Sequence, residues 1–429
     1  MKREKFRPPA SSRCRPVRAR SPMVAETGAG PLPGGAEAFR QPEPAPKFQI
    51  REPNDDRTMS RTLVFVVTED WFFVSHFLPM LRSARRAGFE PVVITRVREH
   101  RGAIEAAGGR VIALEADRRN LNPLAILKTV RRLAAILRAE DPRFVHCIAL
   151  RSILVGGLAA RLSGRRHCIF AVTGGGFLMA RTDLVGRATI AAIAFVMRRI
   201  LGRSRTQFLF ENEDDPKRLG LSPRDPDVTI VGGAGVDPDH YRPTGRVPDD
   251  RLRVAVVSRM LWSKGVDLVV EAVTRARASG ARIELALYGA PDPANPRSIA
   301  TETLAEWSGR EGIFWHGPTD DPRKVWAEND VACLASRGGE GLPRTLLEAA
   351  ACGRALVTTD VPGCRSFVRD GVDGFVVPPN DAEALKRALE RLAGDRDLVE
   401  RMQRESRARV LDGFTEDAVS AKVEAMYGR

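Results

Sequence analysis

The chain has 429 residues, which is long enough for two domains with complete hydrophobic cores. Hydrophobic residues make up 43% and charged residues 28%, an ordinary balance for a globular protein, while the formal net charge of +14 predicts attraction to polyanions. No nucleic-acid motif accompanies this charge and aromatic residues are only 6%, so we expect an anionic membrane surface and an anionic substrate as partners, and no nucleic acid.

The pattern of cysteines and the hydropathy of the chain indicate in which cellular compartment the protein is expected. The six cysteines are scattered, without CxxC pairs or histidines at metal-ligand spacing, which predicts neither a zinc site nor a disulfide framework. No apolar run reaches the roughly 18 residues that span a bilayer. We therefore expect a cytoplasmic protein that is peripheral at the inner face of the cytoplasmic membrane. The sequence gives no indication of the oligomeric state.

The first 58 residues are rich in Pro, Arg, Gly and Ala and have almost no apolar periodicity, which predicts disorder. They lack the apolar core of a secretory signal. Met59 stands just before the first expected strand. A start site at Met59 is a serious alternative, in which the upstream stretch is not translated.

In the next part of the chain, short apolar runs alternate with amphipathic segments, which predicts a doubly wound parallel α/β sheet. The expected strands are 62–68, 91–95, 111–114, 144–148, 169–172 and 207–212, and the expected helices are 77–87, 100–107, 124–139 and 153–162. Ligands of such sheets bind beyond the carboxyl ends of the strands, which lie here at 69–76, 149–152 and 173–177; the first of these is expected as a loop.

Residues 187–201 form an apolar stretch flanked by arginines. We favour a core helix here, and the alternative is a helix whose apolar face enters a membrane interface. The boundary of the first domain is expected just beyond 229–237, which gives a domain over 59–240.

A second α/β domain is predicted over 241–412. The expected strands of this domain are 252–257, 283–288, 313–315, 331–334, 355–358 and 375–377, and its expected helices are 266–276, 299–309, 322–328 and 382–392. A C-terminal helix is predicted in 413–429, and it can cross back to the first domain. No sequence repeat of 20–50 residues is visible.

Two glutamates eight positions apart mark the stretch 337–353. Glu340 lies in a glycine-rich loop, and Glu348 lies inside a short helix that Pro343 can open, on the same face as Arg344. The opposite face is apolar and should pack on a sheet; it consists of Leu346, Leu347, Ala350 and Ala351. The helix N-terminus suits a phosphate, and the carboxylates suit sugar hydroxyls. The alternative is a solvated loop glutamate and a surface ion pair.

Two cations follow a predicted strand, Arg259 and Lys264. Cations held there would stabilise the negative charge that grows on a departing diphosphate, without a metal. Two basic residues in a loop are, taken alone, more often solvated.

The stretch 337–353 resembles the E-x7-E motif of retaining GT-B glycosyltransferases of the family 4 type. The following segments, 355–365 and 370–379, resemble the same family, and the likeness runs from about Thr62 to about Leu411. The T-E-D-W opening, the segment 149–157 and T-G-G-G-F resemble transferases that extend undecaprenyl-diphosphate-linked sugars for surface polysaccharides. The resemblance implies two Rossmann-like domains facing across a cleft, the first for the acceptor and the second for a nucleotide-sugar.

The resemblance also implies roles for single residues. Glu340 would contact the hydroxyls of the donor sugar and Glu348 the ribose, while Arg259 and Lys264 match the R-x4-K-G motif at the diphosphate. The remaining donor-binding residues would be Gly341, Leu342, Pro343, Arg344, Gly289 and Trp315. Backbone N–H groups near Leu342 would hold the diphosphate, although Pro343 has none to give. The base would lie near 314–317, where Trp315 could equally belong to the core.

Two departures from the family pattern concern the reacting sugar. Many members have a histidine where this chain has Thr173, followed by Gly174 and Gly175, so the contact to the sugar's 6-position has no assigned residue. A glutamate often follows P-G-C-R, and here Ser366 stands there while Arg365 is kept. We assign Thr173, Gly174, Gly175, Arg365 and His76 as contacts to the acceptor or sugar.

For His76 and for His146, a structural role is favoured over a catalytic one. The pairs Asp55-Asp56, Asp214-Asp215 and Asp320-Asp321 are interpreted as solvated or capping groups.

Together these features predict a retaining, metal-independent hexosyltransferase that needs no cofactor. It would move a sugar from a UDP-linked donor to a hydroxyl of a glycan or an undecaprenyl-diphosphate-linked acceptor, by front-face departure in which the leaving phosphate helps to deprotonate that hydroxyl. The alternatives are a GT-B-fold nucleotide-sugar epimerase and a non-catalytic nucleotide-sugar-binding protein.

Overall fold

The computed structural model describes residues 60–115, 122–174, 183–202, 205–245, 250–293 and 295–428. The disorder predicted for residues 1–58 and the contact predicted for Gly175 concern residues outside these ranges. Among the described residues, no helix combines the length and the apolar character that crossing a bilayer requires.

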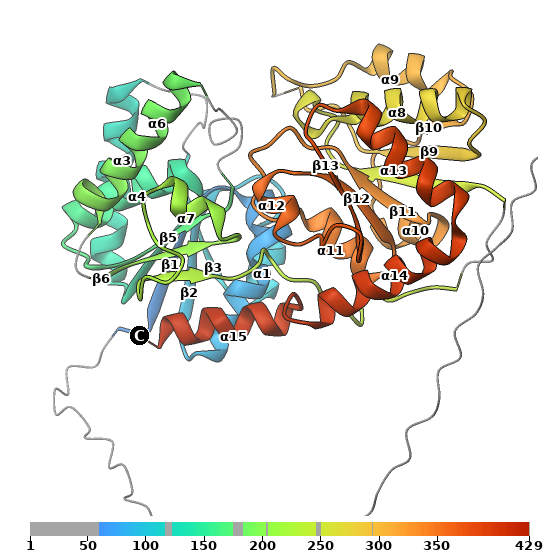
Figure 1. Ribbon diagram of the computed structural model, residues 1–429. Helices are drawn as coiled ribbons and strands as arrows, with labels where there is room; N and C mark the ends of the chain where they lie inside the picture. Colours follow the sequence, from blue (N-terminus) through green and yellow to red (C-terminus); the bar gives the residue numbers. More distant parts are fainter. Residues whose placement is uncertain are drawn as a thin grey trace, which may run out of the picture. The chain divides into compact units, whose positions relative to one another are not determined.

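The first lobe is built on a parallel seven-stranded sheet of order β3-β2-β1-β4-β5-β6-β7 (Figure 1). Its strands are β1 (Thr62–Glu69), β2 (Glu90–Arg96), β3 (Arg110–Ala113), β4 (Phe144–Ile148), β5 (His167–Val172), β6 (Arg205–Phe210) and β7 (Val228–Ile230). Nearly all β1 side chains are buried, as expected for a parallel strand covered on both faces.

Helices cover both faces of this sheet. Val64 and Val66 join one apolar cluster, and Leu63 and Phe65, which alternate with them, join another. The first cluster includes α3 (Pro123–Glu140), α4 (Ala149–Leu162) and α6 (Leu184–Phe195), and the second includes α1 (Asp70–Arg86), α2 (Arg101–Ala106) and α15 (Glu416–Tyr427). The short helix α7 (Asp214–Arg218) follows β6.

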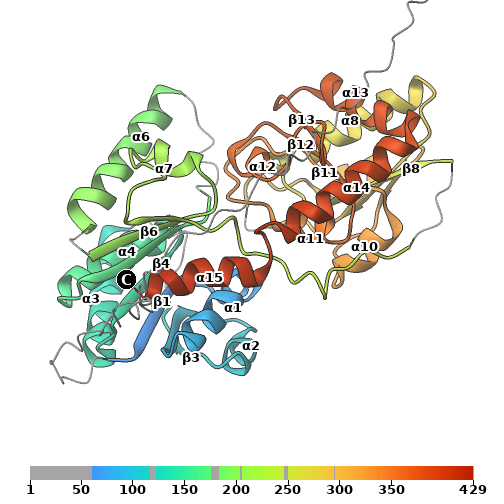
Figure 2. The same ribbon diagram turned by 60° about the horizontal axis from the view of Figure 1, so that its bottom comes forward.

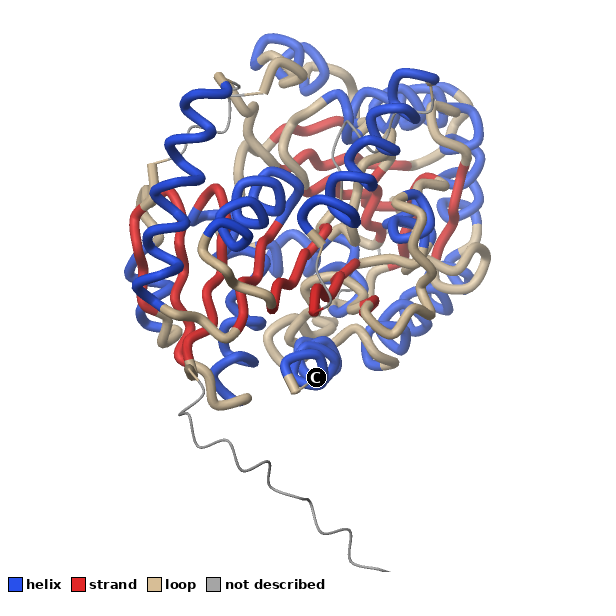
Figure 3. The backbone as a smooth tube through the Cα atoms, turned by 90° about the vertical axis from the view of Figure 1, so that its left-hand side faces the viewer, coloured by secondary structure: helices blue, strands red, loops and turns tan. Residues whose placement is uncertain are grey.

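The second lobe has a parallel six-stranded sheet of order β10-β9-β8-β11-β12-β13. Its strands are β8 (Leu252–Val257), β9 (Ile283–Tyr288), β10 (Ile313–Trp315), β11 (Val331–Leu334), β12 (Ala355–Thr359) and β13 (Gly374–Val377). The helices of this lobe are α8 (Val266–Ala278), α9 (Thr301–Ser308), α10 (Pro322–Glu328), α11 (Arg344–Ala351), α12 (Pro362–Arg365), α13 (Ala382–Gly394) and α14 (Arg396–Leu411). Both sheets follow the Rossmann order, with helices on either side (Figure 3), which confirms the doubly wound class.

This topology decides where ligands can bind. In each sheet the chain starts in the middle, so β1 adjoins β4 and β8 adjoins β11. The segments that leave the carboxyl ends of such a pair diverge to opposite faces and leave a crevice between them. In the second lobe these segments carry Lys264 and Glu340.

The expectation of a loop over 69–76 is wrong, because α1 begins at Asp70, directly after β1. The buried Asp70 carboxylate accepts the N–H groups of Trp71, Arg98 and His100, which fixes the start of the helix without a longer connection. Residues 149–152, at the carboxyl end of β4, form the first turn of α4.

The apolar stretch 187–201 is helical but is not a fully buried core helix. It comprises most of α6 and a π-helical continuation, η1 (Val196–Leu201). Ile190, Met197 and Leu201 are buried, whereas Leu184 and Phe195 are 80% and 60% exposed. The core interpretation therefore holds for one face only.

The end of the chain packs on the first lobe, where α15 contacts α1 (Figure 2). The hydroxyl of Tyr427 lies 3.1 Å from Nδ1 of His146 on β4, and both side chains are buried. Burial lowers the pKa of His146 to about 3, so the ring is neutral at pH 7 and part of the core, as its structural interpretation requires.

Candidate active site

A cavity of about 830 Å³ is lined by residues from both lobes. Trp71 lines it from the first turn of α1, Arg96 from the end of β2 and Arg98 from the segment after β2. Arg259 and Gly289 line it from the segments after β8 and β9. Two of the predicted donor residues thus lie in a cavity at the carboxyl ends of the strands, as the topology requires.

Lys264 and Glu340 meet at the β8–β11 crevice. The Lys264 ammonium donates to both carboxylate oxygens of Glu340, at 2.7 and 2.8 Å, and the Ser336 hydroxyl donates to the same carboxylate at 2.7 Å. Gly265 makes this approach possible, because a Cβ there would lie 1.9 Å from the Ala335 carbonyl oxygen and its φ is +67°. The alternative of a solvated loop glutamate is wrong, since the Glu340 side chain is only 13% exposed.

Arg259 is the more accessible of the two predicted cations. Its side chain is 49% exposed, and its guanidinium lies 3.1 Å from the Asp292 carboxylate within the cavity. Arg259 is therefore able to reach a ligand in the cavity. Trp315 packs against the core of the second lobe and donates its indole N–H to the Gly289 carbonyl at 2.9 Å, so it supports the cavity wall rather than lining it.

Glu348 is held by two donors. Arg344, one turn earlier on α11, donates to Oε1 at 2.7 Å, and the Tyr241 hydroxyl donates to the same oxygen at 3.0 Å. Glu348 is only 6% exposed, so the alternative of a wet surface pair is wrong. Burial next to Glu348 raises the pKa of Tyr241. Sequence reasoning missed Tyr241, because it lies on the connection between the sheets, where no motif marks it.

Arg344 also joins α11 to α1 of the first lobe. Its guanidinium donates to the carbonyl of Ser75. That carbonyl is free of its helical partner because the residue four positions later is Pro79, which has no N–H. Pro79 in α1 thus leaves the Ser75 carbonyl available to accept a hydrogen bond from Arg344 of the second lobe.

His76 lies beside this contact, with Nδ1 2.6 Å from the Ser75 hydroxyl. Burial, with the Arg344 guanidinium nearby and weaker effects of Lys264 and Arg259, lowers the pKa of His76 to about 4. The imidazole is therefore neutral at pH 7 and close to the predicted cations. The structure thus brings His76 into the site, beside Arg344.

The loop 338–343, which we call the donor loop, contacts the ends of β5 and β6. The backbone after β5 lies against it, since a Cβ at Gly174 would be 2.5 Å from the Gly341 nitrogen. The N–H of Leu342, one of the groups predicted to hold the diphosphate, is donated to Oε2 of Glu211 at 2.8 Å. Sequence reasoning missed Glu211, although an acidic residue at the end of a predicted strand was a usable signal.

Two hydroxyl oxygens near the donor loop are buried without a hydrogen-bond partner among the described residues. They are Oγ1 of Thr173, at the end of β5, and Oγ1 of Thr345, in the first turn of α11. The first N–H groups of α11 also have no partner within the helix. Buried polar atoms of this kind favour a polar ligand at the loop.

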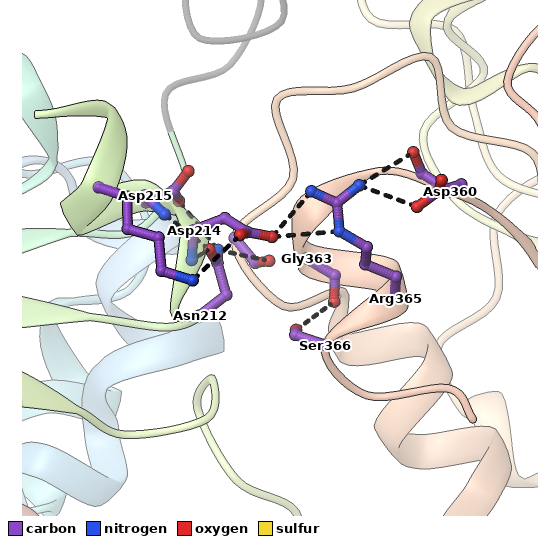
Figure 4. A network of polar contacts seen from close by, with 9 residues as sticks. Asn212, Asp214, Asp215, Asp360, Gly363, Arg365 and Ser366 are labelled. Carbon is purple, nitrogen blue, oxygen red and sulfur yellow. Dashed lines mark hydrogen bonds and ion pairs between the residues drawn. The ribbon is translucent and has the colours of Figure 1, made fainter. Parts of the chain in front are cut away.

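Arg365 connects α12 with the first lobe. It forms ion pairs with Asp214 and Asp360, both at 2.8 Å (Figure 4). Asp215 is 2% exposed and accepts from Asn212, so the interpretation as a solvated or capping group is wrong for Asp215. The Asp214 side chain, in the first turn of α7, is 32% exposed. Asp321 does cap a helix, by accepting the N–H of Arg323 at the start of α10.

Within the part of the chain that the structure describes, no three His, Cys, Asp or Glu side chains are grouped so that they could hold a metal ion. The charged groups gathered at the donor loop are instead cation–carboxylate pairs. Such an arrangement can bind a diphosphate through Arg259 and Lys264, and sugar hydroxyls through Glu340.

Two family models match the chain, one in each lobe. Residues 62–206 match "Glycosyl transferase 4-like", and residues 251–395 match "Glycosyl transferases group 1". A Campylobacter jejuni protein named N,N'-diacetylbacillosaminyl-diphospho-undecaprenol alpha-1,3-N-acetylgalactosaminyltransferase is 25% identical over 83% of this chain and 96% of its own length. The putative glycosyltransferase EpsD of Bacillus subtilis is 23% identical over 82% of this chain and 93% of its own length.

Solved structures share the fold at low sequence identity. A glycosyltransferase from Rickettsia africae superposes with a TM-score of 0.67 at 18% identity, over 86% of this chain and 98% of its own. The Anabaena protein HepE, solved in complex with UDP and glucose, has a TM-score of 0.67 at 14% identity, over 86% of this chain and 99% of its own. At these identities the likeness shows the architecture alone.

Proposed function

The chain belongs to the glycosyltransferases, with the GT-B fold of two Rossmann-like lobes, and we propose that it moves a sugar from a UDP-linked donor to a hydroxyl of a lipid-linked or glycan acceptor. The carrying observation is the Lys264–Glu340 pair at the β8–β11 crevice, with Arg259 in the adjoining cavity. The C. jejuni relative, named for an undecaprenol-linked acceptor, supports an undecaprenyl-diphosphate acceptor here.

We further propose that transfer retains the anomeric configuration and needs no divalent metal. Arg259 and Lys264 would bind the diphosphate and stabilise the charge that develops on it as the glycosidic bond breaks. Glu340 would accept hydrogen bonds from the sugar hydroxyls, and Glu348 from the ribose. The departing phosphate oxygen would take the proton of the incoming hydroxyl, as the resemblance to retaining GT-B transferases implies.

The epimerase and binding-protein alternatives are not favoured. Both matched family models and the relatives described above are glycosyltransferases by their descriptions. An epimerase would need acid and base groups around the sugar. His76, the histidine placed near the donor loop, is buried with a pKa lowered to about 4, which makes it a poor acid at pH 7.

We also propose that the first lobe binds an anionic membrane through α6 and η1. Four apolar side chains of this segment are exposed: Leu184, Val185, Phe195 and Ile200. Arg187, Arg198 and Arg199 on the same segment are exposed as well. Apolar side chains beside arginines are the composition that enters the headgroup region of anionic bilayers. A lipid-linked acceptor would then be presented at the surface to which the enzyme binds.

The test is a panel of UDP-sugars in two measurements. The correct donor should raise the melting temperature, because a ligand at a hundred times its Kd stabilises the fold by about 2.7 kcal/mol. The same donor should release UDP only when a diphosphate-linked sugar acceptor is added, and NMR of the product should show the anomeric configuration of the donor. Epimerised donor without acceptor would establish the isomerase alternative, and binding without any turnover would establish the binding protein.

A further inference from the structure

Glu211 reaches from the first lobe into the donor loop of the second. It follows β6, and its Oε2 accepts the N–H of Leu342 at 2.8 Å. The side chain is 7% exposed. The hydrogen bond joins residues 131 positions apart, so it is a tertiary contact and not a local turn.

The donor loop is packed tightly around Gly341. A Cβ at this position would lie 1.8 Å from Oε2 of Glu211, and a Cβ at Gly363 on α12 would lie 1.6 Å from the Gly341 carbonyl oxygen. Any side chain at Gly341 would therefore displace the Glu211 carboxylate. The loop has no free space on the side that Glu211 occupies.

The residues after Glu211 hold the same region of the second lobe. The Asn212 amide donates to the Gly341 carbonyl at 3.4 Å and to Asp215 at 2.9 Å. Asp214 pairs with Arg365 on α12, as Figure 4 shows. These contacts place the segment 211–214 along the donor loop, with Glu211 as the member that binds its backbone N–H.

The donor loop is thus held from two sides. The second lobe holds the Glu340 side chain through Lys264 and Ser336. The first lobe holds the Leu342 amide, two residues later, through Glu211. A rotation of that amide would move the backbone that carries Glu340, so the two contacts act on the same short segment.

We propose that Glu211 is a positioning residue for transfer: it fixes the Leu342 amide and thereby sets the place of Glu340 against the donor sugar. The inference rests on the proposed function, and it makes the donor site of the second lobe incomplete without the first. Glu211 acts through the loop and has no assigned contact with the substrate. Its hydrogen bond needs an acceptor oxygen, which a glutamine also offers.

The experiment compares Glu211→Ala with Glu211→Gln, with Asp373→Asn as the matched control. Asp373 is a fully buried carboxylate of the second lobe, between β12 and β13, that accepts a backbone N–H and also pairs with the Arg369 guanidinium. With the donor found in the panel above, Glu211→Ala should lower kcat by about tenfold or more, as expected for loss of one hydrogen bond that positions a reacting group. Glu211→Gln should restore kcat to within about threefold of the parent.

The affinity for UDP alone distinguishes a misplaced Glu340 side chain from damage to the nucleotide-binding site. Its Kd, measured by calorimetry, should change less than about twofold in Glu211→Ala, because UDP carries no sugar for Glu340 to bind. An unchanged kcat in Glu211→Ala, a Glu211→Gln as slow as Glu211→Ala, or a parallel loss of UDP binding would each overturn the proposal.

If the parent protein shows no sugar transfer, that result counts against the proposed function and leaves the role of Glu211 to be tested separately. Hydrogen exchange of the donor loop provides this separate test. Peptides covering 338–346 should exchange faster in Glu211→Ala than in the parent, with protection recovered in Glu211→Gln and unchanged in Asp373→Asn. Equal protection in the parent and Glu211→Ala would show that Glu211 does not hold the loop.

Discussion

Lys264 gives two hydrogen bonds to Glu340, one to each carboxylate oxygen, and so neutralises it within the donor loop. On the proposed function the two residues bind different parts of the donor, Lys264 the diphosphate and Glu340 the sugar. Donor binding would then replace this ion pair by a contact of each partner with the ligand. The pair joins the two halves of the binding site before the donor arrives.

Glu340→Gln keeps the shape of the side chain and removes its charge. We expect kcat and kcat/KM to fall together by about tenfold to a hundredfold, since a hydrogen bond to a charged acceptor is worth about 1.5–3 kcal/mol. Steady-state kinetics with the donor varied will measure this. Glu302→Gln, an exposed change on α9, is the control and should match the parent.

Glu348→Gln should act mainly on donor binding. Ribose contacts are alike in the ground and transition states, so we expect donor KM to rise by about tenfold with little change in kcat. Tyr241→Phe removes one of the two donors that hold Glu348 and should raise KM less. A fall in kcat at unchanged KM would contradict the ribose role.

Much of the donor site could be predicted because its residues are local in sequence. Pro343, Gly353 and the apolar face of Leu346 and Leu347 predict α11, and the i, i+4 spacing predicts the Arg344–Glu348 pair. What sequence reasoning missed is the other side of the loop. Glu211 and the Ser75 carbonyl come from the first lobe, and no spacing within a single element indicates such tertiary contacts.

The predicted loop over 69–76 failed for a related reason. Its aromatic residues carry no helix signal, and Pro79 argues against a helix through them. The structure overrides both, because the buried Asp70 fixes the start of α1. Phe73 and Phe77 are then buried on the sheet.

Metal independence predicts that chelation leaves the enzyme active. On the proposed function, Arg259 and Lys264 would supply the positive charge that a divalent ion would otherwise place on the diphosphate. Turnover in excess EDTA should stay within about twofold of the untreated rate. Complete loss, restored by Mg²⁺ or Mn²⁺, would show that an ion takes part.

Glu211 should make stability depend on pH. Burial raises its pKa to about 7, opposed by the Leu342 N–H and assisted by Asp215 and Glu340. A folded pKa above the ordinary value near 4.5 means that the folded state binds the proton more tightly. The contribution of the protonated Glu211 side chain to the free energy of unfolding is therefore complete below about pH 4.5, and it is lost as pH rises through 7.

Glu211→Gln removes this titration. The variant should gain stability relative to the parent between pH 5 and pH 8, by up to about 3 kcal/mol. Urea unfolding at both pH values will measure the difference. A constant difference across the range would mean that Glu211 does not titrate there.

Membrane binding through α6 and η1 should depend on both charge and apolar side chains. Co-sedimentation with anionic vesicles should weaken as salt rises, because screening shortens the reach of exposed charges. Phe195→Ser should weaken binding further, and Val372→Ser, an exposed apolar residue on the second lobe, should not. Equal binding to neutral and anionic vesicles would show that the exposed arginines do not contribute to membrane binding.

The return of α15 to the first lobe affects how the chain can fold during synthesis. Val419, Val423, Met426 and Tyr427 complete the apolar layer on one face of the first sheet, and Tyr427 meets His146 across 281 positions. An N-terminal domain usually folds while the rest is still being made. Here the first sheet is made long before α15, so the part of this face that α15 covers stays exposed while the second lobe is being synthesised. During that time α1 and α2 are the helices of this apolar layer that are already present.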